Sequence, residues 1–190
     1  KERTLKDWKE IFKLSVIDGG VRISGYKKDD IVIEIPDNME GKPVTFVGDG
    51  AFKNNTNVKK IILPIGVKVI GPNAFKGCTA LEEIIIPETL EEIGYSAFEN
   101  CEGLCECFLA DKVKFIGANA FKGCISLKYM NLPKELDRLC LGLLDGCTAL
   151  VQVTIPDSVT AIYDYAFRDC KSLEEIKIPE KLEIIGIGAF

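Results

Sequence analysis

The stretch LEEIIIPETLEEIGYSAFENC, residues 81–101, contains the pattern that decides the fold. The pattern returns 23 residues later, because residues 104–124 read LCECFLADKVKFIGANAFKGC. In both stretches a Leu is followed by alternating apolar residues, then by a second short apolar segment, and then by Ala-Phe-x-x-Cys. A fixed period of this length is typical of repeat proteins, in which similar units stack on one another.

The same period extends over most of the chain. Phe occupies one register in six units, Leu144 replaces it in the remaining unit, and Cys follows this register by three residues in five units. The two columns are Phe52, Phe75, Phe98, Phe121, Phe167 and Phe190, and Cys78, Cys101, Cys124, Cys147 and Cys170. A Pro column follows the alternating segment at Pro64, Pro87, Pro133, Pro156 and Pro179, with Ala110 as the exception. We therefore assign five full repeats to residues 58–172 and a partial one to 173–190.

Each unit has a simple physical interpretation. The alternation before the Pro predicts a short strand with one buried face, and the Pro ends that strand because it has no N–H to donate. Ala-Phe-x-x-Cys reads as a turn of α-helix or 3₁₀-helix that presses its Phe inward. One unit cannot bury its apolar face alone, so copies must stack with equivalent strands parallel and about 4.8 Å apart. This predicts a right-handed coil with one broad, strand-lined face.

These units resemble the BspA-like (Treponema pallidum type) leucine-rich repeats. The resemblance implies an α/β-type leucine-rich repeat solenoid, a right-handed superhelix of 23-residue repeats with a parallel sheet on one face and few regular helices. It also implies a family typical of bacterial surface proteins and of some protozoan parasites, whose members are associated with adhesion to host proteins and other cells. The family has no residue-level functional motif to carry over. We expect altered turn geometry in the fifth unit, and the departures from the family pattern are Asp30, Asn55, Ala110, Cys140, Tyr163 and Leu143-Leu144.

The N-terminal region differs from the repeats. Thr4-Leu5-Lys6-Asp7 fits a capping box, which predicts an amphipathic helix over 4–14. Alternation in 21–23 and 31–35 predicts a hairpin. We divide the single domain into a helical cap or linker (1–20), a capping hairpin with an irregular first repeat (21–57), and the leucine-rich repeats (58–190). Because the chain starts at Lys1 without Met and stops inside a repeat at Phe190, we expect it to be a fragment of a longer protein.

Composition excludes several classes of function. The chain has no His, which removes the usual general base and the commonest metal ligand, so we expect no enzyme and no cofactor or metal. Its net charge of −5 and lack of basic runs argue against nucleic acid, whose affinity comes mainly from phosphate neutralisation. No apolar stretch approaches the roughly 20 residues that a membrane span needs.

The eight cysteines favour a structural role. Five share the repeat register, and a column of five cannot pair completely, so we expect buried, reduced thiols that behave as small hydrophobes. Cys101, Cys105, Cys107 and Cys140 are the one group that suggests a metal, but their spacing lacks the two-residue separation of zinc knuckles.

The outward registers of the strands provide the candidate binding site. Ile62, Ile85 and Phe108 occupy one outward column, with Tyr129 diagonally beside it, and Glu83 and Glu106 lie at the rim. Three contiguous rungs of large apolar side chains predict a protein- or peptide-binding stripe. The alternative is that these residues only favour strand pairing between rungs.

The resulting functional hypothesis is a non-catalytic protein-binding and adhesion module of a cell-surface or secreted bacterial protein. Its expected partners are host extracellular or neighbouring-cell surface proteins, and we expect a monomer. Two alternatives stay open: a structural spacer without its own ligand, and an intracellular interaction scaffold, which free cysteines would favour.

Overall fold

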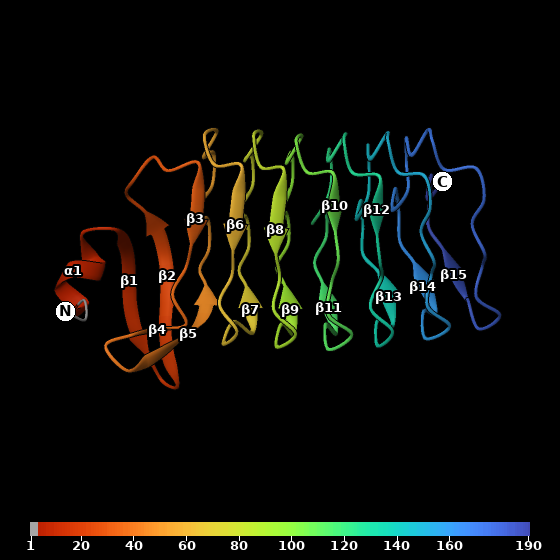
Figure 1. Cartoon of the computed structure of the whole chain (residues 1–190). Coiled ribbons are helices and arrows are strands. Elements are labelled where there is room, and N and C mark those ends of the chain that lie inside the picture. Colours follow the sequence, from red (N-terminus) through yellow and green to blue (C-terminus); the bar gives the residue numbers. More distant parts are fainter. Residues whose placement is uncertain (1–3) are drawn as a thin grey trace.

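The computed structural model describes residues 4–190 and shows one elongated stack of rungs (Figure 1). Each rung is one 23-residue repeat, and strands of successive rungs pair in parallel, as in β6 (Lys60–Ile62) with β8 (Glu83–Ile85). The predicted solenoid of 23-residue repeats with parallel strands is therefore confirmed. We name the rungs by a strand that each contains: the β8 rung (81–103), the β10 rung (104–126), the β12 rung (127–149) and the β14 rung (150–172).

The strands form two columns instead of one. The first column contains β3, β6 and β8 in one sheet and β10 and β12 in another. The second contains β1, β2, β5, β7, β9 and β11, with β4 beside β5, and then a separate sheet of β13, β14 and β15. The segment that follows the Pro thus contributes a short strand to the second column, and its apolar residues, such as Leu90 before β9 and Ile93 within it, are fully buried. The remaining bounds are β3 (Val32–Glu34), β4 (Asn38–Met39), β5 (Lys42–Val47), β7 (Val69–Ile70), β9 (Glu92–Ile93), β10 (Glu106–Cys107), β11 (Phe115–Ile116), β12 (Tyr129–Met130), β13 (Arg138–Leu139), β14 (Ala161–Ile162) and β15 (Ile184–Ile185).

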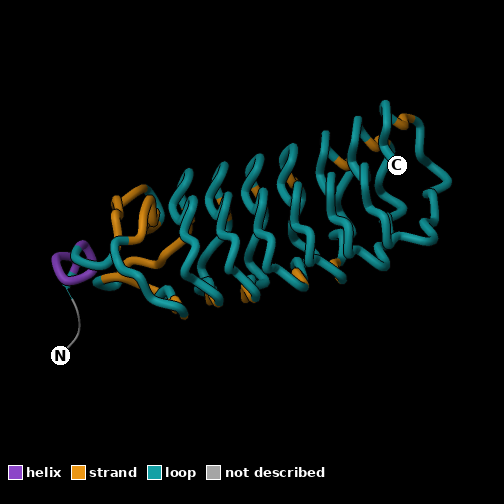
Figure 2. Tube along the Cα trace, turned by 90° about the horizontal axis from the view of Figure 1, so that it is seen from above, coloured by secondary structure: helices purple, strands orange, loops and turns teal. Residues whose placement is uncertain are grey.

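The third side of the coil consists of turns, which appear as loops between the strands in Figure 2. The Ala-Phe-x-x-Cys segments form hydrogen-bonded turns, with Cys78 N donating to Phe75 O at 3.1 Å, and no regular helix occurs there within residues 4–190. Backbone hydrogen bonds join these turns from rung to rung, as in Phe75 N to Ala97 O at 2.7 Å. Two positions in each turn adopt positive φ, which explains why Gly and Asn recur there.

The Phe column forms the centre of the core. Phe75, Phe98 and Phe121 are fully buried, and adjacent rings stack with centroids 5.0–5.1 Å apart. Leu144 interrupts the stack, which resumes between Phe167 and Phe190 at 5.5 Å. Every rung therefore shares its apolar interior with its neighbours, as a repeat architecture requires.

The predicted helix over 4–14 is wrong in its second half. Helix α1 covers Leu5–Lys9, with the expected capping box between Thr4 and Asp7, and β1 (Phe12–Ile17) follows. The residues of β1 pair antiparallel with β2 (Gly20–Tyr26), because Asp18-Gly19 supplies the tight turn between the two strands. Strand pairing therefore overrides the helical stripe beyond residue 9. Residues 1–3 of the segment 1–20 lie outside the described residues.

The predicted hairpin between 21–23 and 31–35 is also wrong. β2 pairs with β1 on one side and in parallel with β5 on the other, whereas β3 belongs to the opposite column and pairs in parallel with β6. The alternation indicates strands at both places, as the structure has them, but the two strands are not partners of each other. The Asp-Gly turn that identifies the true hairpin lies upstream of both.

The second column is interrupted between the β10 and β12 rungs. β11 and β13 belong to different sheets, although the turns alongside stay joined, with Phe121 N donating to Leu143 O at 3.0 Å. The interruption coincides with Cys140, which stands where the preceding rungs have Gly; a Cβ at Gly117 would come within 2.4 Å of Tyr95 N. Tyr163 occupies the same register, and its backbone N still donates to Leu139 O. A side chain at this register is therefore tolerated within the sheet of β13, β14 and β15.

Candidate functional site

The structure places the predicted stripe on the outer side of the first strand column. Ile85, Phe108 and Tyr129 are exposed by 43, 60 and 50 %, and Ile62 is half-buried. Strand register sets Ile62 beside Ile85 and Glu106 beside Tyr129. These large apolar side chains thus lie in solvent on neighbouring rungs.

The two predicted rim carboxylates have different surroundings. Glu83 Oε2 lies 2.8 Å from Lys60 Nζ, so its charge is neutralised by the rung before it. Glu106 is exposed and forms no ion pair within residues 4–190. Only Glu106 is therefore available to a positively charged partner.

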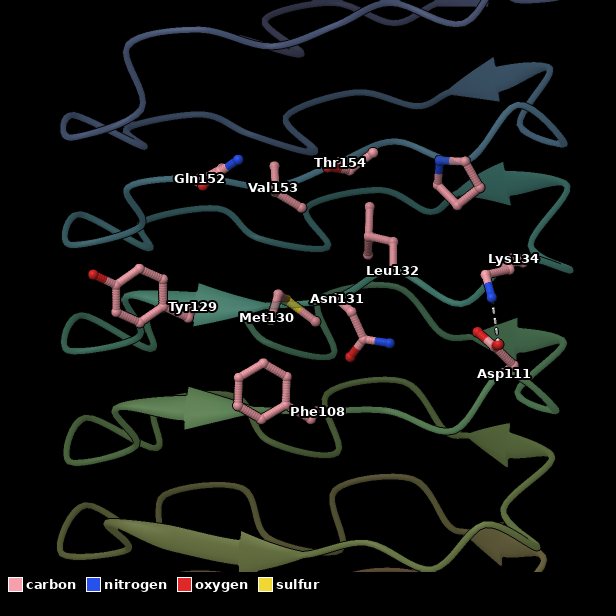
Figure 3. A pocket seen from close by; sticks show the side chains of 11 residues that line it. Phe108, Asp111, Tyr129, Met130, Asn131, Leu132, Lys134, Gln152, Val153 and Thr154 are labelled. Carbon is pink, nitrogen blue, oxygen red and sulfur yellow. Dashed lines mark hydrogen bonds and ion pairs between the residues drawn. The ribbon is translucent and has the colours of Figure 1, made fainter.

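The stripe is divided into two halves. β8 and β10 belong to separate sheets, so Ile62 and Ile85 share one sheet, while Tyr129 lies on the next sheet and Phe108 directly follows β10 of that sheet. The second half borders a hollow of about 390 Å³ on the outer face of the β10, β12 and β14 rungs. Ile62, Ile85, Glu83 and Glu106 are not among its lining residues. The hollow is lined by Phe108, Asp111, Tyr129, Met130, Asn131, Leu132, Lys134, Gln152, Val153, Thr154 and Pro156 (Figure 3).

The floor of the hollow is apolar and its walls are mixed. Met130, Leu132 and Val153 are buried, because they are the inward-facing residues of their rungs. The outward neighbours in the same segments contribute the Phe108 and Tyr129 rings and the small polar side chain of Thr154. A hollow with apolar surface and a few polar groups is the usual composition of a binding site.

Asn131 shapes the boundary between the β10 and β12 rungs. Its Nδ2 donates to Leu109 O at 2.7 Å, and Leu109 N donates to its Oδ1 at 2.6 Å, so the side chain bridges the two rungs. In the first two rungs of this column a direct backbone hydrogen bond joins the rungs instead, as in Leu63 N to Ile85 O at 3.0 Å. Because the Asn131 side chain points back toward the β10 rung, it leaves open the space beyond it.

An ion pair closes one end of the hollow. Lys134 Nζ and Asp111 Oδ2 lie 2.8 Å apart on adjacent rungs (Figure 3). The hydrogen bond and the charge of Asp111 raise the pKa of Lys134 above its ordinary value. Both side chains are exposed, so this pair neutralises the end of the hollow without adding much stability.

Sequence reasoning named Phe108 and Tyr129 but missed the hollow beside them. Gln152, Thr154 and Asn131 occupy outward registers, yet nothing in a polar outward residue marks it as part of a site. One signal was present: Asn131 ends the run of large apolar residues Ile62, Ile85 and Phe108 in its column. The ion pair of Asp111 and Lys134 could have been found from their spacing of 23 residues.

The cysteines form their own column inside the stack. All eight are free thiols, and those of the repeat register each donate to a carbonyl of the preceding rung. For example, Cys101 Sγ lies 3.2 Å from Phe75 O. Burial raises the pKa of Cys78, Cys107 and Cys170 to about 12, so these thiols stay protonated at neutral pH and are poor nucleophiles.

Two further features bear on function. Within residues 4–190, no group of three or more Cys, Asp or Glu side chains is arranged to hold a metal ion, and Cys101, Cys105, Cys107 and Cys140 form no such group. No helix within residues 4–190 has the length and apolar character needed to cross a membrane.

Comparisons with known proteins agree with this architecture. Among solved structures, a leucine rich cell surface protein from Faecalibacterium prausnitzii is 33% identical with a TM-score of 0.87, and the match covers 94% of this chain and 50% of that one. A leucine rich repeat protein of T. pallidum is 29% identical with a TM-score of 0.71, covering 92% of both chains. A leucine-rich repeat protein from Bacteroides ovatus is 29% identical with a TM-score of 0.76, covering 93% of this chain and 54% of that one.

The chain therefore spans about half the length of the F. prausnitzii and B. ovatus proteins. No curated protein matches the sequence. The family described as BspA type leucine rich repeat region matches with six copies over residues 45–140 and 103–190. Together with the stacked 23-residue rungs, this match shows that the chain belongs to the BspA-type leucine-rich repeat family.

Proposed function

We propose that this chain is a non-catalytic protein-binding module of a bacterial cell-surface or secreted protein, with extracellular or cell-surface proteins as its partners. The observation that carries the proposal is the exposure of Ile85, Phe108 and Tyr129 on adjacent rungs, with Phe108 and Tyr129 beside an open hollow. Burial of large aromatic groups supplies most of the binding energy of protein interfaces. Membership of the family, and the similarity to a cell surface protein, support the same role.

The fold suits such a role because it presents a preformed surface. Each rung is held by the buried Phe column and by backbone bonds in the turns, so the outer face needs little ordering when a partner binds. A preorganised surface loses less conformational entropy on association and therefore binds more tightly for the same contacts.

The test measures binding of the purified chain to a panel of extracellular-matrix and epithelial surface proteins by surface plasmon resonance. We expect Phe108→Ser and Ile85→Ser each to weaken any observed binding by about tenfold or more, since each removes an aromatic or aliphatic anchor. Ile65→Ser is the matched control, because Ile65 is an exposed apolar residue outside the stripe.

Binding that is unchanged in both stripe variants, with an intact melting transition, would remove the stripe as the binding surface. Absence of binding to every member of the panel would favour a spacer role.

A further inference from the structure

Four backbone groups around the hollow lack the rung-to-rung hydrogen bonds that the equivalent groups form in the first two rungs of this column. In the earlier rungs, the residue before the Pro donates its N–H to the next rung, as Ile35 N does to Ile62 O and Leu63 N to Ile85 O. The corresponding bond from Leu132 N to Thr154 O is not formed. Phe108 O does not accept the expected hydrogen bond from the β8 rung, because Ile86 N forms no bond to it. Asn131 O does not accept the expected bond from Leu109 N, because Leu109 N donates to the Asn131 side chain instead.

All four groups belong to residues that line the hollow: Phe108 O, Asn131 O, Leu132 N and Thr154 O. A backbone N–H or C=O that has no protein partner must find one in water or in a ligand. The hollow therefore combines an apolar floor, two aromatic rings and a set of available backbone donors and acceptors. An extended peptide has the complementary chemistry, since its backbone offers N–H and C=O groups and its side chains alternate in direction.

The charged side chains around the hollow indicate which charge a bound peptide should carry there. Glu106, opposite Tyr129 in the strand pair, and Asp157, next to Pro156, are exposed and unpaired within residues 4–190. Lys134 is neutralised by Asp111, and the exposed Lys128 offsets one of the two free carboxylates. The unpaired carboxylates of Glu106 and Asp157 favour a positively charged neighbour on the ligand.

We propose that the hollow is the anchor pocket for an extended peptide segment of a protein partner, with one aromatic side chain inserted beside Phe108 and Tyr129 and a Lys or Arg next to it. This inference rests on the proposed protein-binding function and specifies its ligand. The volume of about 390 Å³ is near the lower end of the usual range for small-ligand sites, which fits a single large side chain. The backbone of the bound segment accepts a hydrogen bond from Leu132 N and donates one to Thr154 O.

The test uses blocked dipeptides as probes and amide NMR of the chain as the readout. N-acetyl-Trp-Arg-amide is expected to shift the amide signal of Leu132 in a saturable way, and N-acetyl-Trp-Glu-amide to bind several-fold more weakly because of Glu106 and Asp157. N-acetyl-Ala-Arg-amide, which lacks the anchor, is expected to cause no saturable shift. Thr154→Trp fills the hollow and should weaken the Trp-Arg probe by about tenfold or more, whereas Ile65→Ser should not change it.

The possible failures are distinguishable. If no probe shifts Leu132, or if the Ala-Arg and Trp-Arg probes bind equally, the anchor pocket is disproved; binding of whole proteins that is lost in Ile85→Ser would then still support the proposed function. If Thr154→Trp binds the Trp-Arg probe like the unmodified chain while its melting transition is intact, the probe sits elsewhere and the inference falls.

Discussion

The Sγ atom of Cys124 lies 3.1 Å from the carbonyl oxygen of Phe98 in the preceding rung. The same relationship joins Cys78 to Phe52 and Cys147 to Phe121. The repeated Cys therefore fills a tight inner corner and also donates a weak hydrogen bond between rungs. This explains why Cys recurs at a register where a disulfide column cannot form.

We expect Cys124→Ala to lower the free energy of unfolding by roughly 1–2 kcal/mol, because it leaves a small cavity and removes the bond to Phe98 O. Urea unfolding followed by circular dichroism measures this change. Cys105→Ser is the control, because Cys105 is exposed and its substitution should have little effect. Equal unfolding midpoints for the two variants would contradict a structural role for the column.

Stability should fall at alkaline pH because of the same thiols. A Cys in the unfolded chain has a pKa of about 8.5, whereas burial raises the pKa of Cys78 to about 12. Above pH ~8.5 the unfolded state therefore binds fewer protons than the folded state, so stability is full below that pH and is lost as the pH rises toward 12. The measurement is the urea midpoint across this window. Cys78→Ala should show a shallower decline, and an identical decline would contradict this cause.

Asp145 is expected to act as a buried anion shared by three rungs. Its carboxylate accepts two hydrogen bonds from Arg168, at 2.6 and 2.8 Å, and lies 3.4 Å from Lys122 Nζ. Arg168→Ala would remove both hydrogen bonds and leave this buried carboxylate with the single ion pair to Lys122, so we expect a clear fall in the urea midpoint. Arg138→Ala removes an equally well-formed pair with Asp137, but that carboxylate is exposed, and we expect almost no change. Similar midpoints in the two variants would show that burial of Asp145 has no energetic consequence.

Asn131 should hold the β10 and β12 rungs together where the backbone does not. We expect Asn131→Ala to lower the free energy of unfolding by about 1–2 kcal/mol, because Leu109 loses both of its bonds to the side chain. The Leu109 amide should then exchange hydrogen faster, which NMR measures directly. Gln152→Ala provides the control, because Gln152 lines the same hollow without a side-chain hydrogen bond within residues 4–190. Unchanged exchange at Leu109 would disprove the bridging role.

Some errors of prediction came from local patterns that two structures can satisfy. Phe12 and Leu14 fit the end of an amphipathic helix and also the alternation of a strand, and only pairing with β2 decides between them. Likewise, the alternation of 31–35 correctly indicated a strand, but sequence alone did not show that its partner is β6. Strand partners are chosen by contacts between residues distant in sequence, which a local pattern does not contain.

The candidate site shows the same division. The outward position of Phe108 and Tyr129 followed from alternation, because side chains of a strand point to opposite faces. The hollow next to them did not, since it depends on how far the β12 rung stands from its neighbours and on the direction of one Asn side chain. Neither quantity is set by the pattern of polar and apolar residues.

The amino-acid sequence by itself determined the stacked solenoid, because an apolar residue that returns every 23 positions can leave water only by packing against its own copies. It also determined that the repeated cysteines face inward, three residues after the register that Phe or Leu144 occupies. The tertiary structure alone decided where the rungs separate. Hydrogen bonding between rungs depends on separations of a few tenths of an ångström, and these are set jointly by side chains from several repeats.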